Sequence, residues 1–243
     1  MLKAVTFDFW NTLVREREAE SVEQVVIRRF QDLFRTWAQE RTRAEIAAVT
    51  KACRDLVMAG QVNEGKEMPP EAQLKWIFQR LRIDTNPELE AAAHEAYTTA
   101  SLEVLPLPVT GVAQVLPKLK EHLTLAVICN TGRTPGSIAR VILERLGLLH
   151  YFSYLAFSNE LGVAKPHPAI FQKTIAELGV RPNEAAHIGD DPRTDVKGSK
   201  AVGMYSIWFN PRGSASAEVA CDLMLTRYED LVPWVLGQSR RTE

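Results

Sequence analysis

Acidic and polar residues follow directly after apolar runs at three places in the chain. Asp8 ends one run, Asn130 and Thr131 follow a second, and a third opens onto Asp190 and Asp191. In an open parallel sheet the carboxyl ends of the strands share one edge, where ligands bind. We therefore expect these side chains to converge on one site.

The expected site has a composition suited to phosphoryl transfer. Carboxylates placed together repel one another unless a cation lies between them, and an oxygen-only donor set without His or Cys suits Mg²⁺. Lys165, which follows another strand-like run, adds a positive charge. An anionic nucleophile, a metal and an ammonium are what a phosphoryl group requires if an anion is to attack it. We therefore predict Mg²⁺ as the cofactor and a small phosphorylated metabolite as the substrate.

The elements that must position these residues alternate between strand and helix. Strands are expected at residues 2–7, 124–129, 154–157, 185–188 and 205–209. Helical patterns lie between the later runs, at residues 112–121, 137–146, 168–178 and 194–201. This alternation is typical of a parallel sheet covered by helices, so we expect an α/β fold with a doubly wound sheet. Residues 1–14 and 106–243 together form this predicted core.

The segment between these two parts has a different pattern. From about residue 20 to 104 strand signals are nearly absent, and apolar residues recur at the spacing of helices. Helices are expected from residue 22 and over residues 43–58, 70–81 and 87–104. Their short connections predict an inserted helical bundle formed by residues 15–105, with Trp37, Trp76 and Phe78 in its core.

Four motifs in the chain resemble those of the haloacid dehalogenase-like hydrolases. In order they are DFWNTL at residues 8–13, CNTG at 129–132, KP at 165–166 and GDDPRTD at 189–195. Each lies at the end of a predicted strand. The resemblance implies a Rossmann-like core, and the inserted bundle is similar to the family's helical cap of the first class, which closes over the site and selects the substrate.

The resemblance implies catalytic roles for four of these residues. Asp8 is implied to be the nucleophile that becomes an aspartyl phosphate, a covalent step that splits one displacement into two. Thr12, with the side chain at position 129, holds the oxygens of the transferring group. Lys165 neutralises that group and restrains Asp8, and Asp195 is expected close enough to orient the lysine.

The same resemblance implies a set of metal ligands. Asp190 binds Mg²⁺ together with Asp8 and the main-chain carbonyl of Trp10. Asp191 and Asp195 are expected to lie close enough to act as ligands as well.

Trp10 departs from the pattern of the family's phosphatases, which carry a second Asp two residues after the nucleophile. That Asp protonates the leaving oxygen and then activates water, whereas an indole cannot transfer the proton. General acid–base catalysis supplies about 10² to 10⁴ in rate, so alkyl phosphates are expected to react slowly. We predict a preference for aryl or acyl phosphates, and we expect the indole to narrow the substrate pocket.

Cys129 is a second departure, because the family usually has Ser or Thr at this position. A thiol is a weak hydrogen-bond donor, so one phosphoryl oxygen is held less well unless Thr131 takes over the contact. Asn130 fits the family motif. Together with Trp10, these three residues are expected to contact the substrate.

Two alternative functions remain open. The 2-haloacid dehalogenases also lack the second Asp, but they replace the acidic fourth motif with neutral polar residues, whereas this chain keeps Asp190, Asp191 and Asp195. Three acids beside Asp8 without a cation are costly, which favours the metal enzyme. The other alternative is a catalytically weakened relative that binds a phosphorylated ligand without turnover.

Other polar residues near the motifs have plainer interpretations. His167 and His187 are expected to be a loop histidine and a packed histidine, since no paired metal-ligand spacing accompanies them. Two interpretations are open for the arginines near the motifs, Arg15, Arg17 and Arg133. They contact an anionic substrate, or they are exposed surface residues without such a role.

Charge and cysteine usage limit the classes of partner. The 29 basic and 30 acidic residues give a net charge of -1, and no extended basic run is present, which argues against nucleic acid or an anionic membrane. Three scattered cysteines indicate no disulfide framework. The apolar run before Asp8 is too short for a signal peptide, so a cytoplasmic protein is expected. No pattern indicates an oligomeric state.

Overall fold

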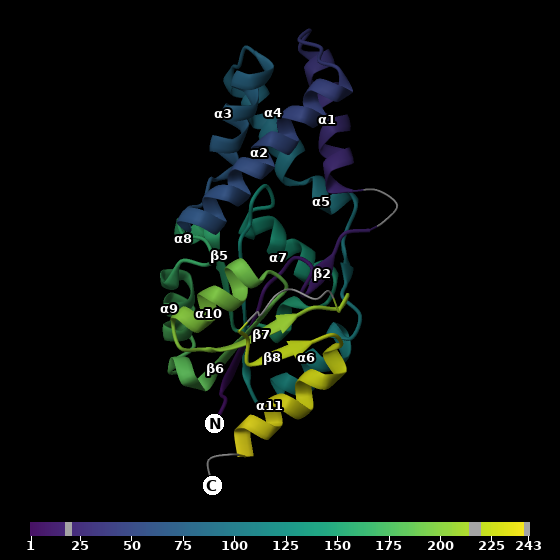
Figure 1. Cartoon of the computed structure of the whole chain (residues 1–243). Helices are drawn as coiled ribbons and strands as arrows, with labels where there is room; N and C mark the ends of the chain where they lie inside the picture. The colour runs from purple at the N-terminus through teal and green to yellow at the C-terminus, as the bar shows by residue number, and fades with distance from the viewer. Residues whose placement is uncertain (18–20, 214–219, 241–243) are drawn as a thin grey trace.

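The centre of the molecule is a six-stranded parallel sheet (Figure 1). A computed structural model describes residues 1–17, 21–213 and 220–240 of the 243-residue chain. In the order β5-β4-β1-β6-β7-β8 every neighbouring pair is parallel, which confirms the predicted α/β fold. The strands are β1 (Ala4–Phe7), β4 (Thr124–Cys129), β5 (Tyr154–Phe157), β6 (Ala185–Gly189), β7 (Tyr205–Phe209) and β8 (Leu223–Leu225).

β1 lies in the middle of the sheet, between β4 and β6. From β1 the sheet runs to β4 and β5 on one side and to β6, β7 and β8 on the other. The strand order therefore reverses beside β1, and the crevice outside the carboxyl ends at such a point is where α/β sheets bind ligands. Phe7 pairs with Val127 and Ile188, so the residues that follow the three strands start from one edge.

Helices cover both faces of the sheet. Side chains alternate between the two faces along each strand, so each strand presents apolar side chains on both sides. Val5 packs into one core cluster, and its neighbour Ala4 packs into a second. The first cluster includes residues of α6 (Val112–Lys120), α7 (Gly136–Arg145) and α11 (Leu231–Arg240), and the second includes residues of α9 (Pro168–Glu177). Both faces of the sheet are therefore removed from water, as parallel strands require.

A group of helices lies at the end of the molecule drawn at the top of Figure 1, and we call it the helical region. Capping boxes at Ser21 and Thr42 begin its first two long helices. Phe78 belongs to its apolar core, and Trp37 and Trp76 pack against that core partly buried, as the sequence predicts. The helices are α1 (Val22–Thr36), α2 (Arg43–Glu64), α3 (Pro70–Leu81), α4 (Pro87–Thr98) and α5 (Ala100–Glu103).

A short antiparallel ladder connects the helical region to the sheet. β2 (Val14–Arg15) pairs with β3 (Leu107–Pro108), and Val14 lies opposite Pro108. The chain therefore enters and leaves the helical region at adjacent points. The proposed domain boundaries, after residue 14 and after residue 105, fall beside this ladder and remain predictions.

Several elements differ from the sequence-based expectations. The helix expected over residues 194–201 is a π-helical turn (Pro192–Val196) followed by α10 (Lys197–Ala201), and the segment expected as one helix over 87–104 is divided into α4 and α5. The ladder strands β2 and β3, the edge strand β8 and the short α8 (Ser158–Leu161) were not expected. These elements are too short for a periodic pattern to indicate them.

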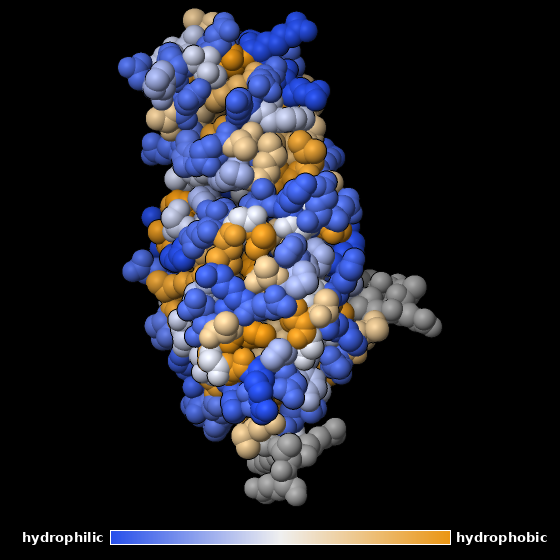
Figure 2. All heavy atoms as spheres, turned by 90° about the vertical axis from the view of Figure 1, so that its left-hand side faces the viewer, coloured by the Kyte–Doolittle hydropathy of each residue, from blue (hydrophilic) through white to orange (hydrophobic). Residues whose placement is uncertain are grey.

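The surface is mixed in character. Figure 2 shows one face on which hydrophilic residues interrupt the apolar ones. Within the described part of the chain, the exposed large apolar side chains are Met1, Leu56, Met58 and Met224. None of the helices described combines the length and the apolarity needed to cross a bilayer.

Candidate active site

The loop after β1 presents Asp8 at the edge of the sheet. The backbone N–H of Asp8 still donates to Ile188 O at 2.8 Å, so β6 fixes the position of this residue. The chain then turns sharply, because the N–H of Val14 donates back to Phe9 O at 3.0 Å. Asn11 has a φ of 58° in this turn, a left-handed conformation that Asn tolerates better than most residues.

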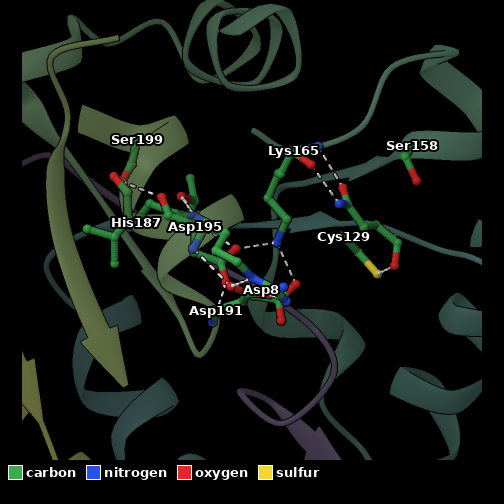
Figure 3. A network of polar contacts seen from close by, with 12 residues as sticks. Asp8, Cys129, Ser158, Lys165, His187, Asp191, Asp195 and Ser199 are labelled. Atoms are coloured by element: carbon green, nitrogen blue, oxygen red, sulfur yellow. Dashed lines mark hydrogen bonds and ion pairs between the residues drawn. The ribbon is translucent and has the colours of Figure 1, made fainter. Parts of the chain in front are cut away.

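Three charged side chains meet at this edge (Figure 3). Lys165 Nζ lies 2.5 Å from Asp8 Oδ1 and 2.7 Å from Asp195 Oδ1, and all three side chains are buried. Burial disfavours the ammonium, but Asp195 and Asp8 outweigh that effect and raise the pKa of Lys165. The lysine is therefore a fixed positive charge between two carboxylates.

His187, on β6, extends this network into the core. Its Nε2 lies 3.1 Å from Asp195 Oδ1, and its Nδ1 lies 2.8 Å from Thr6 Oγ1. Burial lowers the pKa of His187, and an ionised carboxylate can only accept a hydrogen bond. Nε2 therefore carries the proton and donates to Asp195, while Nδ1 accepts from the Thr6 hydroxyl. The packed histidine expected from the sequence also holds Asp195 in place.

Asp190 completes what we call the carboxylate cluster, formed by Asp8, Asp190 and Asp195. One oxygen from each lies within 4.8 Å of the others. Burial raises the pKa of Asp8 to about 8; Lys165 opposes this effect, and the two other acids add to it. Burial, with repulsion from Asp195, raises the pKa of Asp190 to about 6.

The carboxylate cluster fits a divalent cation in its chemistry. Its donors are oxygen atoms alone, the set that Mg²⁺ prefers. The raised pKa values of Asp8 and Asp190 show that the charged forms are disfavoured among these residues. A cation between the carboxylates favours those charged forms.

Asp191 is placed differently from its neighbour in sequence. Its carboxylate caps the turn that follows, accepting from the backbone N–H of Arg193 at 2.9 Å and from the guanidinium of Arg193 at 2.7 Å. Its own N–H donates to Asp195 Oδ2 at 3.0 Å. The structure thus pairs the Asp191 side chain with Arg193, outside the carboxylate cluster, and uses the Asp191 backbone to hold Asp195.

Asn130, directly after β4, fixes the backbone of Lys165. Its Nδ2 donates to Lys165 O at 2.9 Å, and its Oδ1 accepts from the Lys165 N–H at 2.7 Å. Both ends of the amide are therefore engaged by the lysine segment. Asn130 was expected to contact the substrate; in the structure its amide instead positions the backbone of Lys165.

Thr131 and Ser158 connect the sheet edge to the helical region. The N–H of Thr131 donates to Ser158 Oγ at 2.8 Å, and the Ser158 hydroxyl donates to Glu67. Glu67 also accepts from Gln61 Nε2 and from the Met68 N–H, each at 3.0 Å. Burial raises the pKa of Glu67, although these three hydrogen bonds oppose the shift.

The side chains of Cys129 and Thr12 are buried. The thiol of Cys129 is buried and contacts the carbonyl of Asn130 at 3.5 Å, and burial raises its pKa well above the ordinary value. Thr12 Oγ1 is buried without a hydrogen-bond partner among the residues that the structure describes. The Thr12 carbonyl accepts from the Tyr228 hydroxyl at 2.9 Å.

A cavity of about 420 Å³ lies between the sheet edge and the helical region. Residues of α2 and α4 line the side of the cavity formed by the helical region. The core side is lined by Asp8, Asn130, Thr131, Lys165, Asp190, Asp191 and Asp195. Trp10 also lines this cavity, and its ring packs edge-on against Phe9 with centroids 5.1 Å apart. Cys129 and Thr12 are not among the lining residues.

The three arginines near the motifs lie in different places. Arg133 lines the 420 Å³ cavity, whereas Arg15 lines a neighbouring cavity of about 960 Å³. Arg17 Nε donates to Leu105 O at 2.8 Å. Of the three, Arg133 is the one that shares a cavity with Lys165.

Sequence reasoning did not single out Ser158 and Glu67. Ser158 directly follows β5, so the rule that identified Asp8 from its place after a strand would have found it too. Glu67 lies in a loop between two helices, where no motif or periodicity marks it.

A model of the haloacid dehalogenase-like hydrolase family matches residues 2–203. A glyceraldehyde 3-phosphate phosphatase of Methanopyrus kandleri is 30% identical over 210 residues, which cover 85% of this chain and 83% of that protein. A Pyrococcus furiosus protein of the same name is 32% identical over 163 residues, 67% of this chain and 65% of its own length. A ribulose-1,5-bisphosphate 5-phosphatase of Halopiger xanaduensis is 34% identical over 136 residues, 56% of this chain and 55% of that protein.

Solved structures of low sequence identity share the fold. A 2-haloacid dehalogenase from Pseudomonas syringae matches with a TM-score of 0.74 and 24% identity, over 98% of this chain and all of that chain. A HAD phosphatase from Thermococcus onnurineus matches with a TM-score of 0.68 and 23% identity, over 97% and 98%. Since the two carry different activities in their names, the fold does not select between them.

Proposed function

Because this chain belongs to the haloacid dehalogenase-like hydrolase family, we propose that it is a Mg²⁺-dependent phosphatase of a small phosphorylated metabolite. The observation that carries the proposal is the contact of Asp8 with Lys165 beside Asp190 and Asp195, on the wall of a cavity of about 420 Å³. Relatives named as phosphatases support the reaction class. A cytoplasmic location remains a prediction.

Asp8 is the nucleophile of the proposed reaction. Its free carboxylate oxygen attacks the phosphorus of the ester, the phosphorus–oxygen bond to the leaving group breaks, and an aspartyl phosphate forms on Asp8. Water then attacks the phosphorus, releases inorganic phosphate and restores the carboxylate. Lys165 holds Asp8 in one orientation and offers positive charge to the transferring group.

The residues around Lys165 keep it in place during both steps. Asp195 receives hydrogen bonds from Lys165 and His187, so the ammonium cannot rotate away from Asp8 without losing its second partner. Asn130 holds the lysine backbone from the other side. These contacts provide the preorganisation on which electrostatic catalysis depends.

Asp8, Asp190 and the main-chain carbonyl of Trp10 would hold the Mg²⁺ ion, with Asp195 beside them. When bound, the ion supplies Lewis-acid stabilisation of the negative charge on the transferring phosphoryl group. Asp191, paired with Arg193, would contribute to this arrangement through its backbone contact with Asp195.

Trp10 determines which leaving groups the proposed enzyme can expel. Its indole lines the cavity where a proton donor would be needed, and it offers no titratable proton. Aryl and acyl phosphates have leaving groups that depart as anions, so we expect them to be hydrolysed faster than alkyl phosphates.

The helical region acts in this proposal as a cap that covers the cavity. Contacts such as Ser158 with Glu67, and Gln73 Nε2 with Gly132 O at 3.1 Å, hold the cap against the sheet edge. Opening of these contacts would admit substrate, and their closure would exclude bulk water.

The proposal is tested by measuring phosphate release from p-nitrophenyl phosphate, acetyl phosphate and a sugar phosphate, with Mg²⁺ or with EDTA. We expect turnover of the first two substrates with Mg²⁺ and none with EDTA. Asp8→Asn should abolish turnover. Asp55→Asn is the matched control, because Asp55 forms an exposed ion pair with Lys51 on α2 and should leave the rate unchanged.

Three results would contradict the proposal. Halide release from a 2-haloacid in EDTA would make the protein a dehalogenase. A Mg²⁺-dependent burst of about one equivalent without steady turnover would make it a phospho-ligand-binding protein. Phosphate release that persists in the Asp8→Asn protein would exclude Asp8 as the nucleophile.

A further inference from the structure

We propose that Arg133, assisted by Arg54, forms a subsite for a second anionic group of the substrate, so that the preferred substrates are phosphate esters that also carry a carboxylate or a second phosphate. This inference rests on the proposed phosphatase function and adds a substrate class to it. Its basis is an arrangement of charge on the wall of the cavity opposite the catalytic edge.

Arg133 reaches from the sheet edge into the helical region. It follows the end of β4, and its Nη2 donates to Glu23 of α1 at 2.5 Å. Its guanidinium also lies 5.8 Å from the centre of the Tyr97 ring on α4. The side chain is only 14% exposed. The contacts of its charged group are therefore with the helical region, whereas Lys165 is the cation that contacts Asp8.

One edge of the Arg133 guanidinium is left without a partner. Nη1 is buried and finds no hydrogen-bond partner among the residues that the structure describes. A buried donor in this state costs free energy, so native proteins seldom keep one without a reason. Because Arg133 lines the cavity and its side chain is partly exposed there, a ligand that draws the guanidinium toward the cavity can supply the missing acceptor.

Arg133 shares its carboxylate partner with a second arginine that lines the cavity. Glu23 faces two arginines, since Arg54 Nη1 donates to the same carboxylate at 3.1 Å, and Arg54 lines the cavity as well. Thr50 Oγ1 adds a further hydrogen bond to Glu23 at 2.6 Å. Glu16 also lines the cavity and acts on the charge of Arg133, so the two arginines face two carboxylates in this part of the molecule.

This wall complements the chemistry at the other side of the cavity. The phosphoryl group of the substrate is assigned to Asp8 and Lys165, so the rest of the molecule extends toward the helical region. A guanidinium presents its donors in a planar fork that matches a carboxylate or a phosphate. A substrate with an anionic group at its far end would give these arginines a charged acceptor, whereas a neutral polyol would not.

The test compares two ligands that differ in one group, 3-phosphoglycerate and glycerol 3-phosphate. Both are titrated calorimetrically, with Mg²⁺, into protein carrying Asp8→Asn, which prevents turnover. We expect 3-phosphoglycerate to bind roughly tenfold more tightly or better, the range for a hydrogen bond to a charged group. Adding Arg133→Met should remove this preference. Arg140→Met is the matched control, because Arg140 pairs with Glu160 away from the cavity, and it should keep the preference.

A second variant changes the affinity in the opposite direction. Glu23 competes with a ligand carboxylate for Arg133, so Glu23→Gln should tighten binding of 3-phosphoglycerate about threefold or more while leaving glycerol 3-phosphate unchanged. A purely structural role for the pair predicts weaker binding of both ligands. Arg133→Lys keeps the charge and should retain part of the preference, so the test survives if Arg133→Met does not fold.

The outcomes separate this inference from the proposed function. Equal affinity for the two ligands, or a preference that persists in Arg133→Met, overturns the subsite even if the native protein hydrolyses p-nitrophenyl phosphate. A preference lost only with Arg133 supports the subsite even if the native protein releases no phosphate, in which case the proposed phosphatase function fails by itself.

Discussion

Trp10 is the residue whose replacement gives the clearest chemical prediction. Trp10→Asp places a proton donor beside the leaving oxygen, and general acid catalysis contributes about 10² to 10⁴ in rate. We expect the turnover number for glycerol 3-phosphate to rise by at least about tenfold, with a smaller change for p-nitrophenyl phosphate. Steady-state kinetics on the two substrates measures the difference.

Trp10→Phe is the control for the size of the side chain, because it removes the indole without adding an acid. It should leave the ratio of the two turnover numbers close to that of the native protein. Equal acceleration of both substrates in Trp10→Asp would show that the indole acts by crowding the cavity.

His187 is a positioning residue, and its loss should affect both stability and turnover. His187→Leu keeps an apolar side chain in the core but removes the hydrogen bonds of the imidazole to Asp195 Oδ1 and Thr6 Oγ1. These two oxygens keep Lys165 Nζ and Ala186 O, respectively, as partners. We expect the free energy of unfolding to fall by about 1.5–3 kcal/mol, the contribution of a hydrogen bond to a charged group. Urea denaturation measures this change, and kcat should fall more than KM rises. A fully stable, fully active variant would remove His187 from the network.

At the residue scale the sequence predicts which side chains gather, but not how each one points. Asp8 and Asp190 each follow a strand, and parallel strands bring such residues to one edge. Asp191 also follows a strand, yet its carboxylate turns to Arg193 because the π-helical turn places that N–H within reach. The hydrogen bond of His187 depends on the register of two neighbouring strands, which no local pattern encodes.

Among the elements, the end of β6 has little tolerance for added atoms. A Cβ on Gly189 would lie 2.1 Å from Asp195 Cγ. Gly189→Ala must therefore displace Asp195 from Lys165, and such overpacking costs about 1–3 kcal/mol or more of stability. We expect a lower unfolding midpoint together with loss of most activity.

Gly237→Ala is the matched control for this substitution. Gly237 lies in α11, and nothing lies within 4 Å of a Cβ built there. Alanine in a helix is favoured over glycine by about 0.5–1 kcal/mol, so this variant should be as stable as the native protein or more so. If both substitutions shift the midpoint of thermal unfolding in the same direction from that of the native protein, the packing argument at Gly189 is wrong.

At the element scale the long, regular segments are the predictable ones. The strands at residues 124–129, 154–157 and 205–209 have the bounds expected from their apolar runs. The π-helical turn at Pro192–Val196 is not predictable from periodicity, because Asp195 must reach back to Lys165 and His187 and the backbone adjusts to this contact. Tertiary contacts decide the conformation of such short elements.

For the molecule as a whole, Glu67 makes the contact between its two parts sensitive to pH. Burial raises the pKa of Glu67 above its ordinary value of 4.5. The folded protein therefore binds more protons than the unfolded chain above that pH, and this group lowers the free energy of unfolding as the pH rises through its folded pKa. Glu67→Gln removes the titration and should make stability decline less steeply as the pH rises above about 4.5.

Chemical denaturation of both proteins at several pH values measures the two slopes. Ser158→Ala is the useful comparison, because it removes the hydroxyl that donates to Glu67 but keeps the carboxylate. That variant should decline more steeply than the native protein, since the charged carboxylate loses one of its donors. Parallel slopes for all three proteins would contradict the assignment.

The paired strands β2 and β3 have a consequence for how this protein can be modified. Because Val14 and Pro108 lie side by side, the polypeptide between them starts and finishes at nearly one point in space. That segment can be exchanged for the corresponding segment of a relative without re-routing the chain of the sheet. A chimera that keeps Asp8, Lys165 and Asp190 but carries a foreign segment should retain the reacting groups, together with Trp10 and Arg133, and take from the donor only the part of the substrate preference that the exchanged helices set.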